Sequence, residues 1–172
     1  MTKHVVLIGL PGSGKSTVGK LVAEAVQAPC HDIDAIVSRK EGRPIQMIFA
    51  ERGEDAFRQL ERQEMEGALA GAPSVIVPGG GWAAQPGALE SVQGRAVLVY
   101  LKTCPDTAST RAVPQGNRPT LMGEDPALQM RQLLGTREPF YLKADAQVET
   151  DRKTAAKVAA EVVELARRRA GW

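Results

Sequence analysis

Long apolar runs, a strong net charge and cysteine-rich motifs are all absent from this chain of 172 residues. No apolar run approaches the roughly 18 residues needed to cross a bilayer, and the N-terminus carries no signal segment, so we expect a cytoplasmic protein without a membrane partner. The net charge of +2 argues against a nucleic-acid partner, because such binding needs a concentrated basic surface. Cys30 and Cys104 lack the spacing of a zinc site or a disulfide framework, so we expect both to be small buried side chains.

Aromatic residues are also scarce: there are two tryptophans, two tyrosines and three phenylalanines. The core must therefore be aliphatic, and platforms on which nucleic-acid bases stack are not expected. Hydrophobic residues still make up 43% of the chain, which is ordinary for a globular protein. Because this length suffices for one good core and no long linker divides the chain, we expect a single domain over residues 1–172.

Short β-branched apolar runs alternate with segments of helical character. Residues 5–8 end in glycines and have the pattern of a strand buried on both faces of a parallel sheet, and residues 75–77 and 96–101 resemble them. Helices are expected over residues 15–26, 45–50, 54–70, 127–134 and 153–169. This alternation predicts an α/β fold. Residues 112–125, rich in proline and glycine, predict a long mobile loop.

Residues 9–16 read GLPGSGKS, which satisfies the phosphate-loop pattern GxxxxGK[ST], between an expected strand and an expected helix. Glycines allow successive backbone N–H groups to turn toward phosphate oxygens, and the helix N-terminus adds a positive dipole end. Lys15 would reach the β- and γ-phosphates, and the Ser16 hydroxyl would ligate Mg²⁺. The segment predicts a nucleoside triphosphate site, and it leaves open whether water or a second substrate accepts the phosphoryl group.

Two aspartates, Asp32 and Asp34, follow the first expected helix, where the chain should approach the carboxyl end of a second strand. Alternation along a strand would place both on one face. One carboxylate would then hold the water shell of a metal, and the other would hydrogen-bond an acceptor hydroxyl. The alternative is a helix N-cap followed by a solvent-exposed acid.

Arg58 and Glu61 stand three residues apart on the helix expected over residues 54–70, so they can pair. Such a pair is either plain surface decoration or an arginine held ready to grip a carboxylate with two hydrogen bonds. The sequence around it leaves both interpretations open.

Several short motifs, taken together and in order, make the chain resemble the shikimate kinase family over nearly its whole length. They are the phosphate loop, Asp32-x-Asp34, Phe57-Arg58-x-x-Glu61, Gly79-Gly80-Gly81, Arg118-Pro119 and Arg137-x-Pro139-x-Tyr141. The resemblance implies a small monomeric P-loop kinase with a five-stranded parallel sheet flanked by helices. It also implies a substrate-binding segment at residues 33–61 and a lid at residues 112–125.

The family transfers the γ-phosphoryl group of ATP to the 3-hydroxyl of shikimate, in aromatic amino acid biosynthesis. The resemblance implies that Asp34 binds shikimate hydroxyls and is the candidate base, and that Arg58 and Arg137 grip the carboxylate. Gly79, Gly80 and Gly81 would let the backbone approach the ring. Lys15 and Arg118 complete the implied catalytic set with Asp34, and Ser16 and Asp32 would lie near Mg²⁺. The implied ATP-binding residues are Gly12, Ser13, Gly14, Lys15, Ser16, Thr17, Arg111, Arg118 and Arg152.

The chain departs from the family pattern at a few positions. Pro78 stands where the family usually has threonine or serine before the triple glycine, while Ser38 and Met47 replace acidic residues. Residues 150–152 resemble the adenine-binding segment of the family, and their alternative is an N-cap before the last helix. Two other functions are compatible with the phosphate loop: gluconate kinase or another small-metabolite kinase, and a nucleotide-binding module without catalysis. Arg58 and Arg137 with the triple glycine favour a compact cyclic carboxylate as the acceptor.

Overall fold

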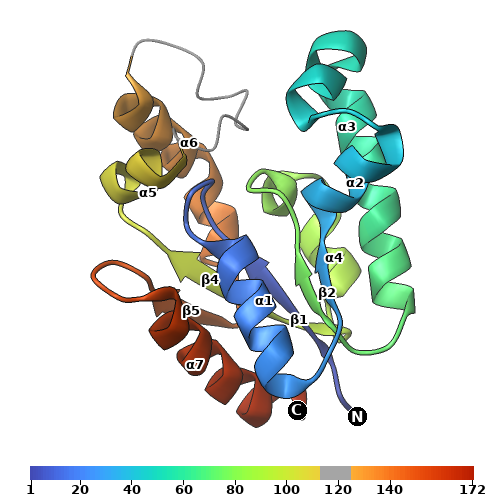
Figure 1. The fold of residues 1–172 in the computed structure, drawn as a ribbon, viewed down its shortest axis with the longest axis vertical. Helices are drawn as coiled ribbons and strands as arrows, with labels where there is room; N and C mark the ends of the chain where they lie inside the picture. The colour runs from blue at the N-terminus through green and yellow to red at the C-terminus, as the bar shows by residue number, and fades with distance from the viewer. Residues whose placement is uncertain (113–124) are drawn as a thin grey trace.

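The computed structural model describes residues 1–112 and 125–172, and their fold is a parallel β-sheet covered by helices on both faces (Figure 1). In the described residues the sheet has five strands in the order β2-β3-β1-β4-β5, all parallel. The strands are β1 (His4–Ile8), β2 (Cys30–Asp32), β3 (Val75–Val77), β4 (Ala96–Lys102) and β5 (Ala146–Glu149). The α/β prediction and the five-stranded parallel sheet are confirmed. Most of the predicted lid, including Arg118, lies outside the described residues.

The central strands are buried on both faces, which is why they are short runs of valine, leucine and isoleucine. Alternate residues of β1 enter two separate cores: Val6 and Ile8 belong to one cluster of buried side chains, and Val5 and Leu7 belong to the other. Tyr100 and Tyr141 lie in the cluster of Val6 and Ile8, so one core is not purely aliphatic.

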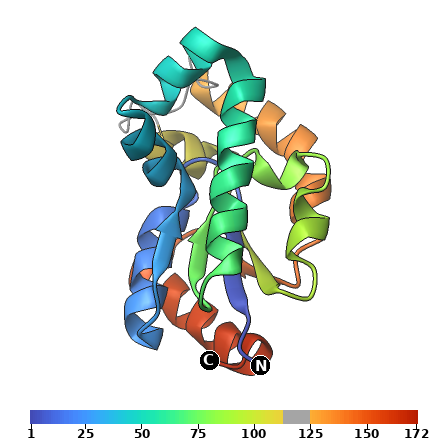
Figure 2. The same ribbon diagram turned by 90° about the vertical axis from the view of Figure 1, so that its right-hand side faces the viewer.

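Two helices, α1 (Lys15–Val26) and α7 (Ala155–Leu165), pack side by side over one face of the sheet (Figure 1). Buried residues of α2 (Ile33–Glu41), α3 (Ile45–Ala70), α4 (Ala88–Val92), α5 (Pro105–Ala112) and α6 (Pro126–Tyr141) belong to the other core. Figure 2 shows α3 facing the viewer and running from the top of the molecule toward the opposite end, where both termini lie. No helix in the described ranges is long and apolar enough to cross a membrane.

Several predicted helix boundaries need adjustment. The helices predicted over residues 45–50 and 54–70 form the single element α3, but Gly53 interrupts its helical geometry with a φ of 83°, so the predicted break is real. Helix α6 continues to Tyr141, beyond the predicted end at residue 134. The last helix begins after Thr154, whose side chain accepts a hydrogen bond from the Lys157 N–H, so an N-cap within residues 150–152 was wrong. A five-residue π-helical segment, Ala166–Ala170, follows α7.

Parallel strands bring three chain segments to one edge of the sheet, where their carboxyl ends meet. Residues 9–16 follow β1, Asp32 ends β2, and Pro78 with the triple glycine follows β3. The loops at this edge are therefore the expected position of a binding site in an open parallel sheet. One expectation about the cysteines was wrong, because Cys104 is exposed just before α5 and Cys30 is only partly buried.

Candidate active site

The phosphate loop has the predicted position between β1 and α1. Gly14 is the N-cap of α1 with a φ of 89°, and Gly12 has a φ of 78°. A Cβ on Gly12 would collide with the Ala108 carbonyl of α5, so the loop packs directly on that helix. The Lys15 ammonium donates hydrogen bonds to the Gly9 and Leu10 carbonyls, each at 2.8 Å. The predicted glycine-dependent turn is thus present in the structure.

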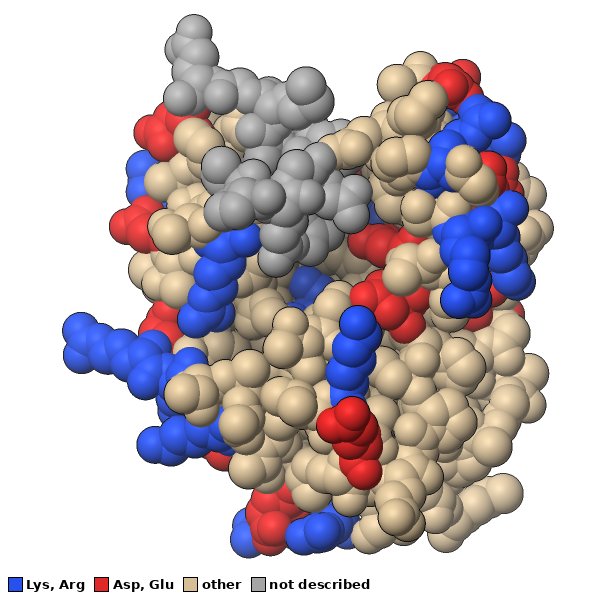
Figure 3. Space-filling view, viewed as in Figure 1, with Lys and Arg blue, Asp and Glu red and all other residues tan. Residues whose placement is uncertain are grey.

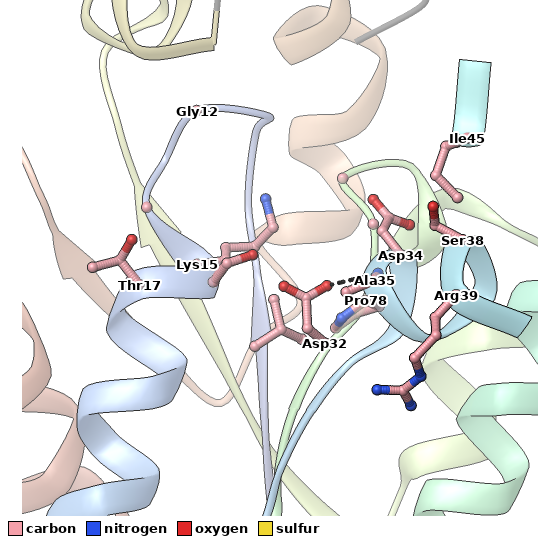
Figure 4. A pocket seen from close by; sticks show the side chains of 15 residues that line it. Gly12, Lys15, Thr17, Asp32, Asp34, Ala35, Ser38, Arg39, Ile45 and Pro78 are labelled. Carbon is pink, nitrogen blue, oxygen red and sulfur yellow. Dashed lines mark hydrogen bonds between the residues drawn. The ribbon is translucent and has the colours of Figure 1, made fainter. Parts of the chain in front are cut away.

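A cavity of about 480 Å³ opens beside this loop (Figure 4). In the space-filling view, acidic and basic side chains meet in a hollow between the side of the molecule that carries α5 and the side that carries α2 (Figure 3). The cavity is lined by the phosphate loop, both predicted aspartates and the start of the glycine segment: Gly12, Gly14, Lys15, Ser16, Thr17, Asp32, Asp34, Ala35, Ser38, Arg39, Ile45, Val77, Pro78, Gly79 and Gly80. Residues from the ends of three parallel strands therefore share one cavity.

The two aspartates reach this cavity by a different route from the one predicted. Asp32 ends β2 and is the N-cap of α2, where its carboxylate accepts the Ala35 N–H at 3.3 Å. Asp34 lies in the first turn of α2, so strand alternation was the wrong reason for their proximity. The alternative interpretation of Asp32 as a helix N-cap is confirmed. The other acid, Asp34, does not point into open solvent as that interpretation expected, because it lines the cavity (Figure 4).

Arg58 and Glu61 form a buried ion pair in α3, with Nη1 of Arg58 2.8 Å from Oε1 of Glu61. Their side chains are 10% and 1% exposed, which excludes surface decoration. The second Glu61 oxygen accepts the Gly79 N–H at 3.2 Å. Burial raises the pKa of the Glu61 carboxyl to about 7, although the charge of Arg58 lowers it. The pair therefore joins α3 to the glycine segment.

The triple glycine is the point at which the predicted acceptor residues meet. A Cβ built on Gly79 would lie 3.0 Å from Oδ1 of Asp34 and 2.9 Å from Oε2 of Glu61. A Cβ on Gly81 would lie 2.9 Å from Nη2 of Arg137 and would collide with the Arg58 guanidinium. Glycine is required here because the charged groups of two carboxylates and two guanidinium side chains occupy the space that side chains would fill.

Two further side chains form hydrogen bonds to this segment, and no role is predicted for them from the sequence. The Tyr141 hydroxyl donates to the Gly80 carbonyl, and the Gln85 amide donates to the Gly81 carbonyl at 3.0 Å. Tyr141 was part of the motif that carried the family resemblance, so a signal existed for it. Gln85 belongs to no motif, and no pattern in the sequence distinguishes it.

Other predicted residues lie elsewhere or outside the described ranges. Arg111, on α5, and Arg152, in the loop after β5, do not line the cavity that contains Lys15. Arg118 falls among the residues that the structure does not describe. Ser38, which replaces a usual acid, donates to the Arg43 carbonyl at 2.8 Å and so ties the end of α2 to the turn before α3.

Comparison with known proteins gives a consistent result. A family model described as shikimate kinase matches residues 11–167. The shikimate kinase of Chlorobium chlorochromatii is 40% identical over 172 residues, covering 95% of this chain and 89% of that protein. The shikimate kinase of Symbiobacterium thermophilum is 38% identical over 164 residues, covering 94% of each chain.

Solved structures resemble the fold to different degrees. Shikimate kinase from Acinetobacter baumannii, solved in complex with shikimate, has a TM-score of 0.91 and 32% identity, covering 96% of this chain and 93% of that one. A gluconokinase from Sinorhizobium meliloti has a TM-score of 0.67 and 21% identity, covering 99% of this chain and 94% of that one, a likeness that extends to the fold alone.

Proposed function

The chain belongs to the shikimate kinase family, and from this premise we propose that it transfers the γ-phosphoryl group of ATP to the 3-hydroxyl of shikimate, giving shikimate 3-phosphate and ADP. An ATP-dependent kinase with shikimate as its acceptor follows from the family and from the similarity to the Acinetobacter enzyme. We also propose a role for each residue in the reaction.

The observation that carries the proposal is the convergence of charges at the triple glycine beside a phosphate loop. Asp34 and Glu61 approach Gly79, while Arg58 and Arg137 approach Gly81. An acceptor with both a carboxylate and hydroxyl groups needs cations and a hydrogen-bond acceptor within one small site. Asp34, Gly79 and Gly80 line the cavity that holds Lys15, and Nη1 of Arg137 would be 3.2 Å from a Cβ on Gly80.

The acceptor would be bound by its carboxylate and activated at one hydroxyl. Arg58 and Arg137 are the cations that would bind the carboxylate, and a guanidinium can do so with two parallel hydrogen bonds. Asp34 would hydrogen-bond the ring hydroxyls and remove the proton from the hydroxyl that attacks phosphorus. The side-chain-free backbone of Gly79, Gly80 and Gly81 supports this arrangement, because it allows a ring to lie close to the main chain.

The nucleotide would be bound mainly by the phosphate loop. Backbone N–H groups around the loop would contact the phosphates, and Lys15 would exchange its carbonyl partners in the loop for phosphate oxygens. Arg118 would neutralise charge on the transferring group. The proposed ATP-binding set is Gly12, Ser13, Gly14, Lys15, Ser16, Thr17, Arg111, Arg118 and Arg152.

Ser16 and Asp32 fit a magnesium ion as the second cofactor. Both are oxygen donors that line the cavity next to the phosphate loop. Mg²⁺ commonly takes one or two protein oxygens and completes its shell with water and phosphate oxygens, so a set this small is sufficient. When bound, the ion would reduce the negative charge of the ATP phosphates. Asp32 would contribute through a water molecule while it remains the N-cap of α2.

We also propose how the chain is divided into segments, its oligomeric state and its location. Residues 33–61 would form the substrate-binding segment and residues 112–125 the lid of a single domain over residues 1–172. The protein would act as a monomer in the cytoplasm, without a nucleic-acid or membrane partner. Light scattering coupled to gel filtration tests the monomer, which a mass of twice 18.4 kDa would contradict.

A coupled assay of ADP release with ATP and Mg²⁺ tests the function, with shikimate, quinate and gluconate as parallel acceptors. We expect strong stimulation by shikimate. Stimulation by gluconate alone would favour the small-metabolite kinase that shares this fold. ATP binding without stimulation by any acceptor would favour a nucleotide-binding module.

A further inference from the structure

The glycine segment is held at three successive residues by side chains from three parts of the chain. Glu61 of α3 accepts the Gly79 N–H, Tyr141 of α6 donates to the Gly80 carbonyl, and Gln85 donates to the Gly81 carbonyl. A run of three glycines has more backbone freedom than any other tripeptide, so it needs such contacts to keep one conformation. Each contact therefore determines the shape of the acceptor site.

Tyr141 also lies near an acceptor-binding cation, Arg137, as Glu61 lies near Arg58. It is fully buried at the C-terminal end of α6, one helical turn after Arg137. Burial raises the pKa of the Tyr141 hydroxyl to about 12, and the charge of Arg137 and a hydrogen bond from it lower that pKa. The hydroxyl thus stays protonated at neutral pH and donates to the Gly80 carbonyl.

We propose that Tyr141 is a positioning residue for acceptor binding, a role that rests on the function proposed above. Because the peptide bond is planar, a fixed Gly80 carbonyl also fixes the opposite direction of the Gly81 N–H. The Arg137 guanidinium lies against the same main chain: its Nη1 would be 3.2 Å from a Cβ on Gly80, and its Nη2 would be 2.9 Å from a Cβ on Gly81. One phenol therefore fixes the stretch of main chain beside which Arg137 lies and the acceptor would lie.

The test compares Tyr141→Phe with Tyr100→Phe, which removes a neighbouring buried hydroxyl. The two rings pack with centroids 5.1 Å apart, but the Tyr100 hydroxyl donates to Glu138 at 3.4 Å and not to the glycine segment. We expect Tyr141→Phe to raise the KM for shikimate about tenfold, equivalent to about 1.4 kcal/mol, with kcat and the KM for ATP within about twofold of wild type. Tyr100→Phe should leave all three constants within about twofold.

Two results would overturn the proposal: an unchanged KM for shikimate in Tyr141→Phe, or an equal rise in Tyr100→Phe, which would indicate loosened packing alone. A second experiment uses an analogue of shikimate with a neutral hydroxymethyl group in place of the carboxylate. The rise in KM caused by Tyr141→Phe should be smaller for this analogue, because Arg137 no longer has its anionic partner. A wild-type protein that ignores shikimate would instead contradict the proposed function.

A measurement that retains Tyr141 covers the case in which Tyr141→Phe does not fold. The chain has two tyrosines, so 3-fluorotyrosine incorporated into Tyr100→Phe labels Tyr141 alone. We expect its ¹⁹F resonance to move on saturation with shikimate and to stay in place with ATP alone. A resonance that shikimate leaves unmoved would contradict the proposal.

Discussion

Glu61 binds the Arg58 guanidinium with one carboxylate oxygen, at 2.8 Å, and uses its other oxygen to accept the N–H of Gly79. A single buried acid thus connects an acceptor-binding cation to the main chain on which the acceptor would lie. The positions of Arg58 and the glycine segment are therefore coupled, and a change at Glu61 should affect both.

Glu61→Gln should remove a pH dependence of stability. The folded-state pKa of Glu61 is raised to about 7, so between about pH 4.5 and 7 the folded state binds more protons than the unfolded state. The wild-type free energy of unfolding should therefore fall, by up to roughly 3 kcal/mol, as pH rises through this window. Urea unfolding of both proteins from pH 4.5 to 8 measures the difference, and a constant difference across the series would contradict the raised pKa.

Asp34→Asn should lower kcat by about 10²- to 10⁴-fold, because the variant cannot accept the hydroxyl proton. We assign Asp34 to the acceptor and not to the nucleotide, so the dissociation constant for ATP should stay within about twofold. Single-turnover kinetics and equilibrium titration with ATP provide the two values. A normal kcat would remove Asp34 from the role of base.

Arg137→Ala should weaken acceptor binding selectively. A hydrogen bond to a charged group contributes about 1.5–3 kcal/mol, so the KM for shikimate should rise about 10- to 100-fold while the KM for ATP is unchanged. Arg58→Ala should act in the same direction. Arg95→Ala is a suitable control, since Arg95 pairs with Glu66 at the surface at 3.4 Å. Loss of ATP affinity with normal shikimate affinity would show the assignment to be wrong.

Gly81→Ala should damage the site without unfolding the protein. Its Cβ would meet the ends of the flexible Arg58 and Arg137 side chains, which can move aside. Displacement of both guanidinium groups should lower kcat/KM for shikimate about 10²-fold. Gly67→Ala is the matched control, because Gly67 lies in α3 and a Cβ built there has nothing within 4 Å. This substitution should stabilise the fold by about 0.5–1 kcal/mol and leave the kinetic constants unchanged. Equal kinetic losses in both variants would refute the steric explanation.

Features that depend on residues close together in the chain could be predicted from the sequence. The phosphate loop and the buried strands follow from local composition, and even the break at Gly53 was expected. Asp34 was wrongly placed by strand alternation, because the three-residue strand β2 ends at the N-cap Asp32 and leaves too few residues for a period to show. The contact between Glu61 and Gly79 joins residues 18 positions apart, and the contact between Tyr141 and Gly80 joins residues 61 apart. No local pattern encodes such contacts, and only the family resemblance brought these segments together.

The absence of side chains in the glycine segment has a consequence for changing the acceptor range. Substitutions at Gly79 or Gly81 would collide with the charged groups that define the site, so new specificity cannot be introduced there one residue at a time. Ser38, Arg39 and Ile45 line the same cavity from α2 and α3. Directed evolution toward larger or differently charged ring acids should therefore vary these three positions and leave the glycine segment intact.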